Sequence, residues 1–251
     1  MGGLTAMNME YLEKVRELLD HVEKNVTPVI DEVSKICAQS IANGGMLYFF
    51  GTGHSHMICE EPFYRAGGLA NIAPLLKGFL MLHESASASS LYERAPGVGS
   101  TVIETSGIKP GDVLFLISNS GRNAGCIDAA IKAREMGVKT VAITSLNHSK
   151  NVASRHPSGK RLFELCDFVL DNGGVLGDAC VHLPGMEEGA MISPTSTVID
   201  ATMVNLTMTA TCEKLLEMGI QPTVYTSANT DDGDRKNAAI IEEFKKRVPI
   251  L

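Results

Sequence analysis

The segment LFLISNSGRNAG, residues 114–125, decides how the rest of this chain is interpreted. It starts as an unbroken apolar run, changes at Ser118 to small hydroxyl and amide residues, and then continues into a helical pattern. An apolar run without alternation is typical of a strand that is covered on both faces. A helix that directly follows such a strand indicates a parallel sheet, with the small polar residues at the turn between them.

Runs of the same kind recur along the chain, and patterns with helical spacing separate them. This alternation predicts right-handed crossovers and a parallel sheet between layers of helices. The predicted strands lie within residues 46–51, 70–76, 112–118, 139–145 and 168–173, and the predicted helices within 55–66, 84–94, 124–136 and 160–166.

Longer helical patterns flank this core. Between Leu12 and Ile36 apolar residues recur at intervals of three and four, which predicts an amphipathic helix. Pro28 interrupts the pattern, so we expect a kink or a break there, with Thr27 as the cap of the second helix. After residue 197 a helix that is apolar on nearly every side is predicted to lie in a core or an oligomer interface. The C-terminal tail predicts a short helix that is capped by Asp234.

The composition excludes several classes of protein. A formal net charge of −7 over 251 residues argues against a nucleic-acid-binding face. The chain has no apolar run long enough to span a membrane and no export signal near its start, so we expect a cytoplasmic protein without a membrane partner. The six cysteines form no CxxC pair and are expected to be reduced thiols, and we expect neither a metal site nor a cofactor.

Three turns next to predicted strands or helices carry hydroxyl groups: GTGHSH at 51–56, SNSGRN at 118–123 and SPTST at 193–197. Backbone N–H groups at a helix start bind anions, and Ser or Thr adds a neutral donor without filling the space. The group that suits such turns is a phosphate. Any single one of them is also compatible with an ordinary helix cap. A nucleotide is weakly supported, because GTGHSH lacks the third glycine of a dinucleotide loop and no GxxxxGK[ST] motif occurs.

GTGHS, SNSG and SPTST, in this order and spacing, resemble the phosphosugar loops of the SIS (sugar isomerase) domain family. The resemblance implies an α/β fold: a three-layer αβα sandwich with a five-stranded parallel sheet of flavodoxin-like type. It also implies a phosphorylated sugar as ligand and a homodimer or homotetramer formed through long helices. We interpret residues 1–251 as a single SIS domain with its core at about 40–218, an N-terminal helical arm at 7–43 and a tail at 219–251. The residues that the resemblance implies for phosphate binding are Gly53, Ser55, Ser118, Ser120, Gly121, Asn123, Thr195, Ser196 and Thr197.

The stretches GTGHSHMICEEPFYRAGG and RHPSGKRLFELCDFVLDNGGVLGDA are similar to a bacterial subgroup of this family that is described as phosphosugar or phosphoheptose isomerase-like. Two positions depart from its better-known members. Heptose-phosphate isomerases carry His and Glu on the helix after the first serine loop, where this chain has Glu61 and Arg65. Isomerases of the arabinose-phosphate type carry Lys before the first-loop serine, where this chain has His54.

An aldose–ketose isomerase needs a base that removes the C2 proton and an acid near the ring oxygen. We select Glu61 as the base by its place on the family's helix, with His54 and Glu84 as further candidates. The acidic residues are also compatible with a simple role near helix starts. The leading hypothesis is therefore a cofactor-free sugar-phosphate isomerase. An amino-sugar-phosphate lyase or etherase, which starts with the same proton removal, and a non-catalytic phosphosugar sensor remain as alternatives.

Overall fold

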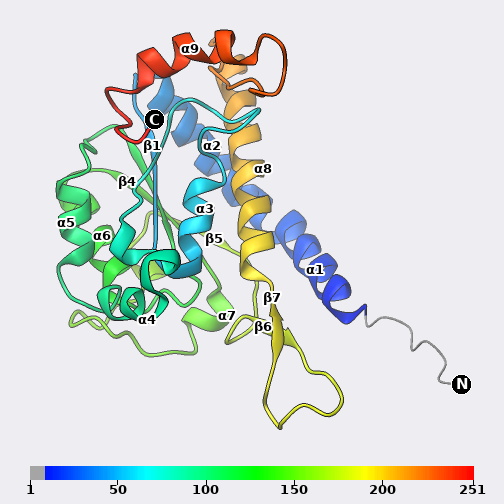
Figure 1. The fold of residues 1–251 in the computed structure, drawn as a ribbon. Helices are drawn as coiled ribbons and strands as arrows, with labels where there is room; N and C mark the ends of the chain where they lie inside the picture. The colour runs from blue at the N-terminus through cyan, green and yellow to red at the C-terminus, as the bar shows by residue number, and fades with distance from the viewer. Residues whose placement is uncertain (1–8) are drawn as a thin grey trace, which may run out of the picture.

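A five-stranded parallel sheet forms the centre of the computed structural model, which describes residues 9–251 (Figure 1). The strand order is β2-β1-β3-β4-β5, which is the flavodoxin-like order expected for this fold class. Each strand falls within one of the apolar runs that predicted it. The strands are β1 (Leu47–Gly51), β2 (Ile72–Pro74), β3 (Val113–Ile117), β4 (Lys139–Thr144) and β5 (Phe168–Asp171).

Helices cover both faces of the sheet, so the predicted three-layer sandwich is confirmed. Successive side chains of β3 alternate between two cores: Phe115 packs in one and Leu116 in the other. The first core receives side chains from α1 (Glu10–His21), α2 (Thr27–Ala42), α3 (His56–Glu60) and α8 (Ser196–Glu217). The second receives side chains from α5 (Val98–Glu104), α6 (Ala124–Glu135) and α9 (Gly233–Phe244).

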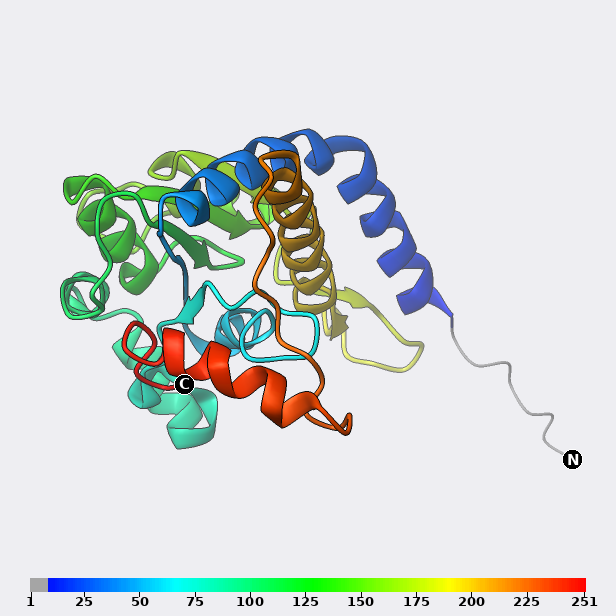
Figure 2. The same ribbon diagram turned by 90° about the horizontal axis from the view of Figure 1, so that it is seen from above.

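The N-terminal arm follows one curved path instead of breaking at Pro28 (Figure 2). A π-helical turn over Val22–Val26 joins α1 to α2, and this wider turn accommodates a proline that has no N–H to donate. The predicted cap at Thr27 is wrong, because its Oγ1 donates to the carbonyl of Glu23 at 2.8 Å inside the helix. Residues 7 and 8 of the predicted arm lie outside the described residues.

Several predicted helices are shorter than expected. The helix predicted over 55–66 ends as α3 at Glu60, just before Pro62. The helix predicted near 160–166 is only a 3₁₀ turn at Leu162–Glu164. The predicted cap at Asp234 is wrong: α9 begins at Gly233 with Asp232 at the N-cap position. The helix predicted over 84–94 is α4 (Leu82–Tyr92).

Two helices and a two-stranded hairpin were not predicted. They are α5, the single-turn α7 (Leu146–Ser149) and an antiparallel hairpin of β6 (Ala179–Val181) and β7 (Ile192–Pro194). The helix α5 is pressed against α6: a Cβ built on Gly99 would lie only 1.8 Å from the carbonyl oxygen of Gly125. Glycine at position 99 therefore allows the start of α6 to lie close to α5.

The long helix α8 is partly a core element and partly a surface. Ile199, Met203 and Val204 are buried, whereas Val198, Leu206 and Leu216 are exposed. The oligomer expected from the long helices stays a prediction. None of the helices in residues 9–251 is both long and apolar enough to cross a membrane.

Candidate functional site

A cavity of about 260 Å³ lies where the carboxyl ends of β1 and β3 meet the start of α8. Ligands of open parallel sheets bind at this edge, because the helix N-termini converge there. The lining residues are Thr52, His54, Ser55, Ile58, Glu93, Ser118, Asn119, Ser120, Asn123, His148, Asp178, Ser196, Thr197 and Asp200.

The structure brings most of the sequence-predicted residues together in this cavity. All three hydroxyl-bearing turns contribute to its wall, with His54 and Ser55 from the first turn. Gly53 and Gly121 lie within the same turns and have φ values of 56° and 58°, which favour glycine. Thr195 is buried and does not line the cavity. The other predicted residues that line it are Ser118, Ser120, Asn123, Ser196 and Thr197.

Three hydroxyls of this wall are available to a ligand. Those of Ser55, Ser120 and Thr197 form no hydrogen bond to any residue in the described part of the chain. The Oγ of Ser118 accepts a hydrogen bond from the N–H of Gly121 at 3.2 Å and keeps its own hydrogen for donation. The strand end of β3 therefore presents small neutral donors to the cavity.

Asn123 has a different environment from the one expected of a phosphate-binding residue. Its Nδ2 donates to Glu93 Oε1 at 2.9 Å, and its Oδ1 accepts from Arg155 Nη1 at 3.1 Å. Thr52 Oγ1 donates to the other oxygen of Glu93 at 2.8 Å. Asn123 and Thr52 thus hold the Glu93 carboxylate in a fixed orientation at the cavity wall.

The start of α8 is already bound by a carboxylate of the chain. Asp178 accepts hydrogen bonds from the N–H of Ser196 at 2.9 Å and from its Oγ at 2.5 Å. It also accepts one from the N–H of Thr195 at 3.1 Å. An anion at a helix N-terminus is stabilised by the unpaired N–H groups and the helix dipole. Asp178 therefore occupies the Thr195 and Ser196 donors through which α8 was expected to bind phosphate, and only the Thr197 hydroxyl stays available.

We predict that Asp178→Ala lowers the free energy of unfolding by about 1–2 kcal/mol, as expected for loss of a helix cap. Asp178 has a φ of 72°, so backbone strain contributes separately from the carboxylate. Asp178→Gly removes the carboxylate without this strain, so comparing the two variants separates the loss of the cap from the backbone strain. Urea denaturation measures both variants, with the exposed Asp231→Ala as control. Unchanged stability in both would contradict the capping role.

Asp200 is a buried carboxyl group at the floor of the cavity, one turn into α8. Its Oδ1 accepts a hydrogen bond from Asn172 Nδ2 at 2.8 Å, and the same amide donates to Asn119 Oδ1 at 2.9 Å. Burial raises the pKa of Asp200 to about 7, the hydrogen bond from Asn172 opposes this shift, and the charge of Asp178 adds to it. A carboxyl group with this pKa exchanges protons readily at neutral pH.

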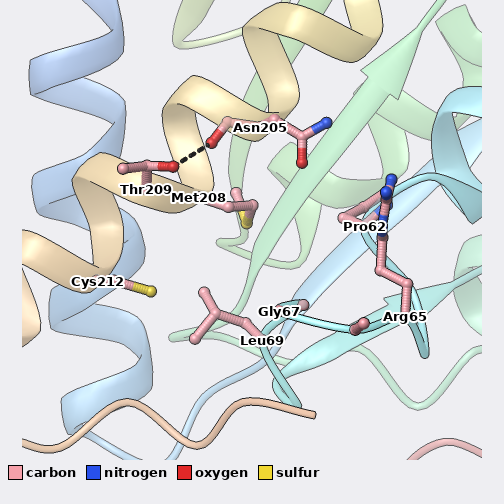
Figure 3. A pocket seen from close by; sticks show the side chains of 10 residues that line it. Pro62, Arg65, Gly67, Leu69, Asn205, Met208, Thr209 and Cys212 are labelled. Carbon is pink, nitrogen blue, oxygen red and sulfur yellow. Dashed lines mark hydrogen bonds between the residues drawn. The ribbon is translucent and has the colours of Figure 1, made fainter. Parts of the chain in front are cut away.

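Two predicted catalytic residues lie away from this cavity. Glu61 pairs with Arg65 and accepts a hydrogen bond from Asn205 Nδ2 at 2.9 Å. Arg65 and Asn205 line a second cavity, of about 330 Å³, between residues 62–69 and α8 (Figure 3). Glu84 is exposed in the first turn of α4, near Gly78.

Four titratable side chains of the first cavity were missed by sequence analysis: Glu93, His148, Asp178 and Asp200. None belongs to a recognisable motif. Asp200 was the easiest of the four to recognise from sequence, because it is a lone acid one turn after SPTST in an otherwise apolar helix. Residues 9–251 hold no group of three or more His, Cys, Asp or Glu side chains that could bind a metal ion. Over the same range all six cysteines are free thiols.

The chain is similar in sequence to known proteins of one family. Residues 10–145 match the model of the SIS domain family. A UPF0309 protein of Geobacillus kaustophilus is 40% identical over 242 residues, which cover 96% of each chain. Another, from Listeria monocytogenes, is 40% identical over 241 residues and covers 96% of this chain and 97% of its own.

Two solved structures have a similar fold. A phosphoheptose isomerase from Francisella tularensis aligns with a TM-score of 0.53 at 16% identity, covering 80% of this chain and 94% of its own. The phosphoheptose isomerase GmhA from Neisseria gonorrhoeae aligns with a TM-score of 0.50 at 18% identity, covering 82% and 95%.

Proposed function

This chain belongs to the SIS domain family, and on that premise we propose that its strand-end cavity binds a phosphorylated sugar. The observation that carries the proposal is the convergence of Ser55, Ser118 and Ser120 on one cavity, with hydroxyls that can donate to an anion. Two proteins of similar fold are named phosphoheptose isomerases, which supports the same ligand class. The phosphate is held by these hydroxyls and by N–H groups of the turn before α6.

The reaction that we propose is aldose–ketose isomerisation through proton removal at C2. Asp200 is the base: its carboxylate takes the C2 proton and leaves an enediolate. A proton then passes from O2 to O1 of this intermediate, and the protonated Asp200 returns its proton to C1, which gives the ketose and restores the carboxylate. Glu93 is less suited to this step because both its oxygens already accept hydrogen bonds. It orients a sugar hydroxyl instead. His54, at the cavity mouth, donates a proton to the ring oxygen when the ring opens.

This assignment moves the proposed base away from Glu61. The Glu61 carboxylate is paired with Arg65 and lies at the second cavity, whereas Asp200 shares a cavity with the phosphate-binding serines. Glu84 is likewise outside that cavity. A base must reach the C2 hydrogen of a sugar whose phosphate is already bound, so the shared cavity favours Asp200 over Glu61 and Glu84.

Proton exchange tests the proposal. The protein is incubated in deuterated water with hexose, heptose and amino-sugar 6-phosphates, and NMR follows the C2 hydrogen. Exchange at C2 with formation of the ketose is the expected result. Loss of a substituent at C3 would favour the lyase instead, and thermal stabilisation without exchange would favour a sensor. No stabilisation and no exchange with any of the sugar phosphates would contradict phosphosugar binding itself.

A further inference from the structure

The side chain of Arg122, in the turn between β3 and α6, has no partner in the described part of the chain. Its Nε is buried, and its guanidinium makes no hydrogen bond or ion pair with any residue in 9–251. Burial removes the Nε–H from water without a hydrogen bond in exchange, which is costly, so proteins pair such groups or leave them to bind a ligand. Ser120 and Asn123, which lie on either side of Arg122 in this turn, both line the cavity.

Two further polar atoms without partners lie beside it. In the described chain four buried side-chain polar atoms have no hydrogen-bond partner, and three of them belong to Arg122, His148 and Ser149. Ser149 Oγ lies 2.8 Å from where a Cβ on Gly121 would be. Burial lowers the pKa of the His148 imidazole; the charge of Asp178 acts against this, and that of Arg122 lowers it further. Neutral His148 can donate a hydrogen bond into the cavity that it lines.

Two further arginines, Arg155 and Arg94, lie near one another and near Arg122. The N–H of Arg155 donates to the carbonyl of Arg122 at 2.8 Å, and its guanidinium reaches Asn123. Partial removal from solvent lowers the pKa of Arg155, and the charges of Arg122 and Arg94 lower it further, with Glu93 acting in the opposite direction. None of these three arginines forms an ion pair with a carboxylate of the described chain. These guanidinium groups are therefore free to bind an added anion beside the cavity.

We propose that the cavity recognises a sugar phosphate with a second anionic group, a carboxylate or a second phosphoryl, which Arg122 binds together with His148 and Arg155. The proposal rests on the phosphosugar-binding function. The phosphate lies at Ser55, Ser118 and Ser120, and the second anion lies beside Arg122. A guanidinium pairs with either oxyanion through two parallel N–H donors, and such charge-assisted bonds give specificity as well as affinity.

Two matched pairs of probes test this by isothermal titration calorimetry. Sorbitol 6-phosphate and 6-phosphogluconate differ only in a hydroxymethyl or a carboxylate at C1. Fructose 6-phosphate and fructose 1,6-bisphosphate differ by one phosphoryl group. We expect the doubly anionic member of at least one pair to bind at least about tenfold more tightly, as a single charge-assisted hydrogen bond provides. Arg122→Met should reduce this ratio to about one while preserving affinity for the singly anionic member.

The control variant is Arg134→Met, which removes one arginine from the far end of α6 and should keep the preference. Arg122→Met should also keep or raise the free energy of unfolding, since it removes an unpartnered guanidinium; a purely structural arginine would show a decrease. If Arg122→Met does not fold, Arg122→Gln replaces it. Two results overturn this inference and leave the proposed phosphosugar binding in place. One is equal affinity of the wild type for the two members of each pair, and the other is an equal loss of affinity for both members in Arg122→Met. Failure of all four probes to bind overturns phosphosugar binding as well.

Discussion

Replacing Ser118 and Ser120 together by alanine is expected to weaken sugar-phosphate binding by about two to four orders of magnitude. Each hydroxyl donates to a phosphate oxygen, and a hydrogen bond to a charged group contributes roughly 1.5–3 kcal/mol. The hydroxyl of Ser120 has no partner in the described chain, and that of Ser118 accepts only from the N–H of Gly121, which the Ser118 carbonyl also binds. The free energy of unfolding should therefore change little.

Calorimetric titration with whichever sugar phosphate stabilises the wild type measures the loss. The matched control is the double variant Ser90→Ala and Ser100→Ala, because these hydroxyls donate only to carbonyls of their own helices or turns. The control should bind like the wild type. If the Ser118 and Ser120 variant also keeps its affinity while folded, the phosphate is not held at the end of β3, and the position of the site is wrong.

The sheet could be predicted from sequence because its strands are buried on both faces. Residues 113–117 and 47–51 carry apolar side chains toward both cores, so the pattern is continuous and unlike that of any neighbouring helix. The turns that carry serines were predictable for a related reason: they directly follow strands whose ends had already been located. The order of strands came instead from the family resemblance, because apolar runs alone do not specify which strands are neighbours.

The acidic half of the cavity could not be predicted, because tertiary structure assembles it from distant segments. Glu93 comes from the end of α4, Asp178 from the turn before β6 and Asp200 from the interior of α8. Each resembles an ordinary helix or turn acid in sequence. Only the fold removes Asp200 from water and places it beside Asn172. Likewise, the sequence predicted Asn123 as a phosphate ligand, whereas in the structure its amide donates a hydrogen bond to Glu93.

Asp200→Asn should alter both catalysis and the pH dependence of stability. The folded pKa of Asp200 is about 7, above the unfolded value of 3.8, so between these values the folded state binds a proton that the unfolded state releases. Stability therefore falls as pH rises through this window, by on the order of 4 kcal/mol once the window is passed. Asparagine keeps the shape and can still accept from Asn172, but it does not ionise. The variant should thus be more stable relative to wild type at pH 8 than at pH 5, by about 2–3 kcal/mol.

The same substitution separates the proposed base from a buried structural acid. Loss of a general base costs about 10²–10⁴ in rate, so C2 proton exchange should fall by that factor while calorimetry still detects the sugar phosphate. Urea denaturation at both pH values supplies the stability data, and the exposed Asp234→Asn should change neither quantity. If exchange persists in Asp200→Asn but the pH dependence is flattened as expected, Asp200 is a buried acid without a catalytic role. The base is then another group of the same cavity, with Glu93 the first to replace.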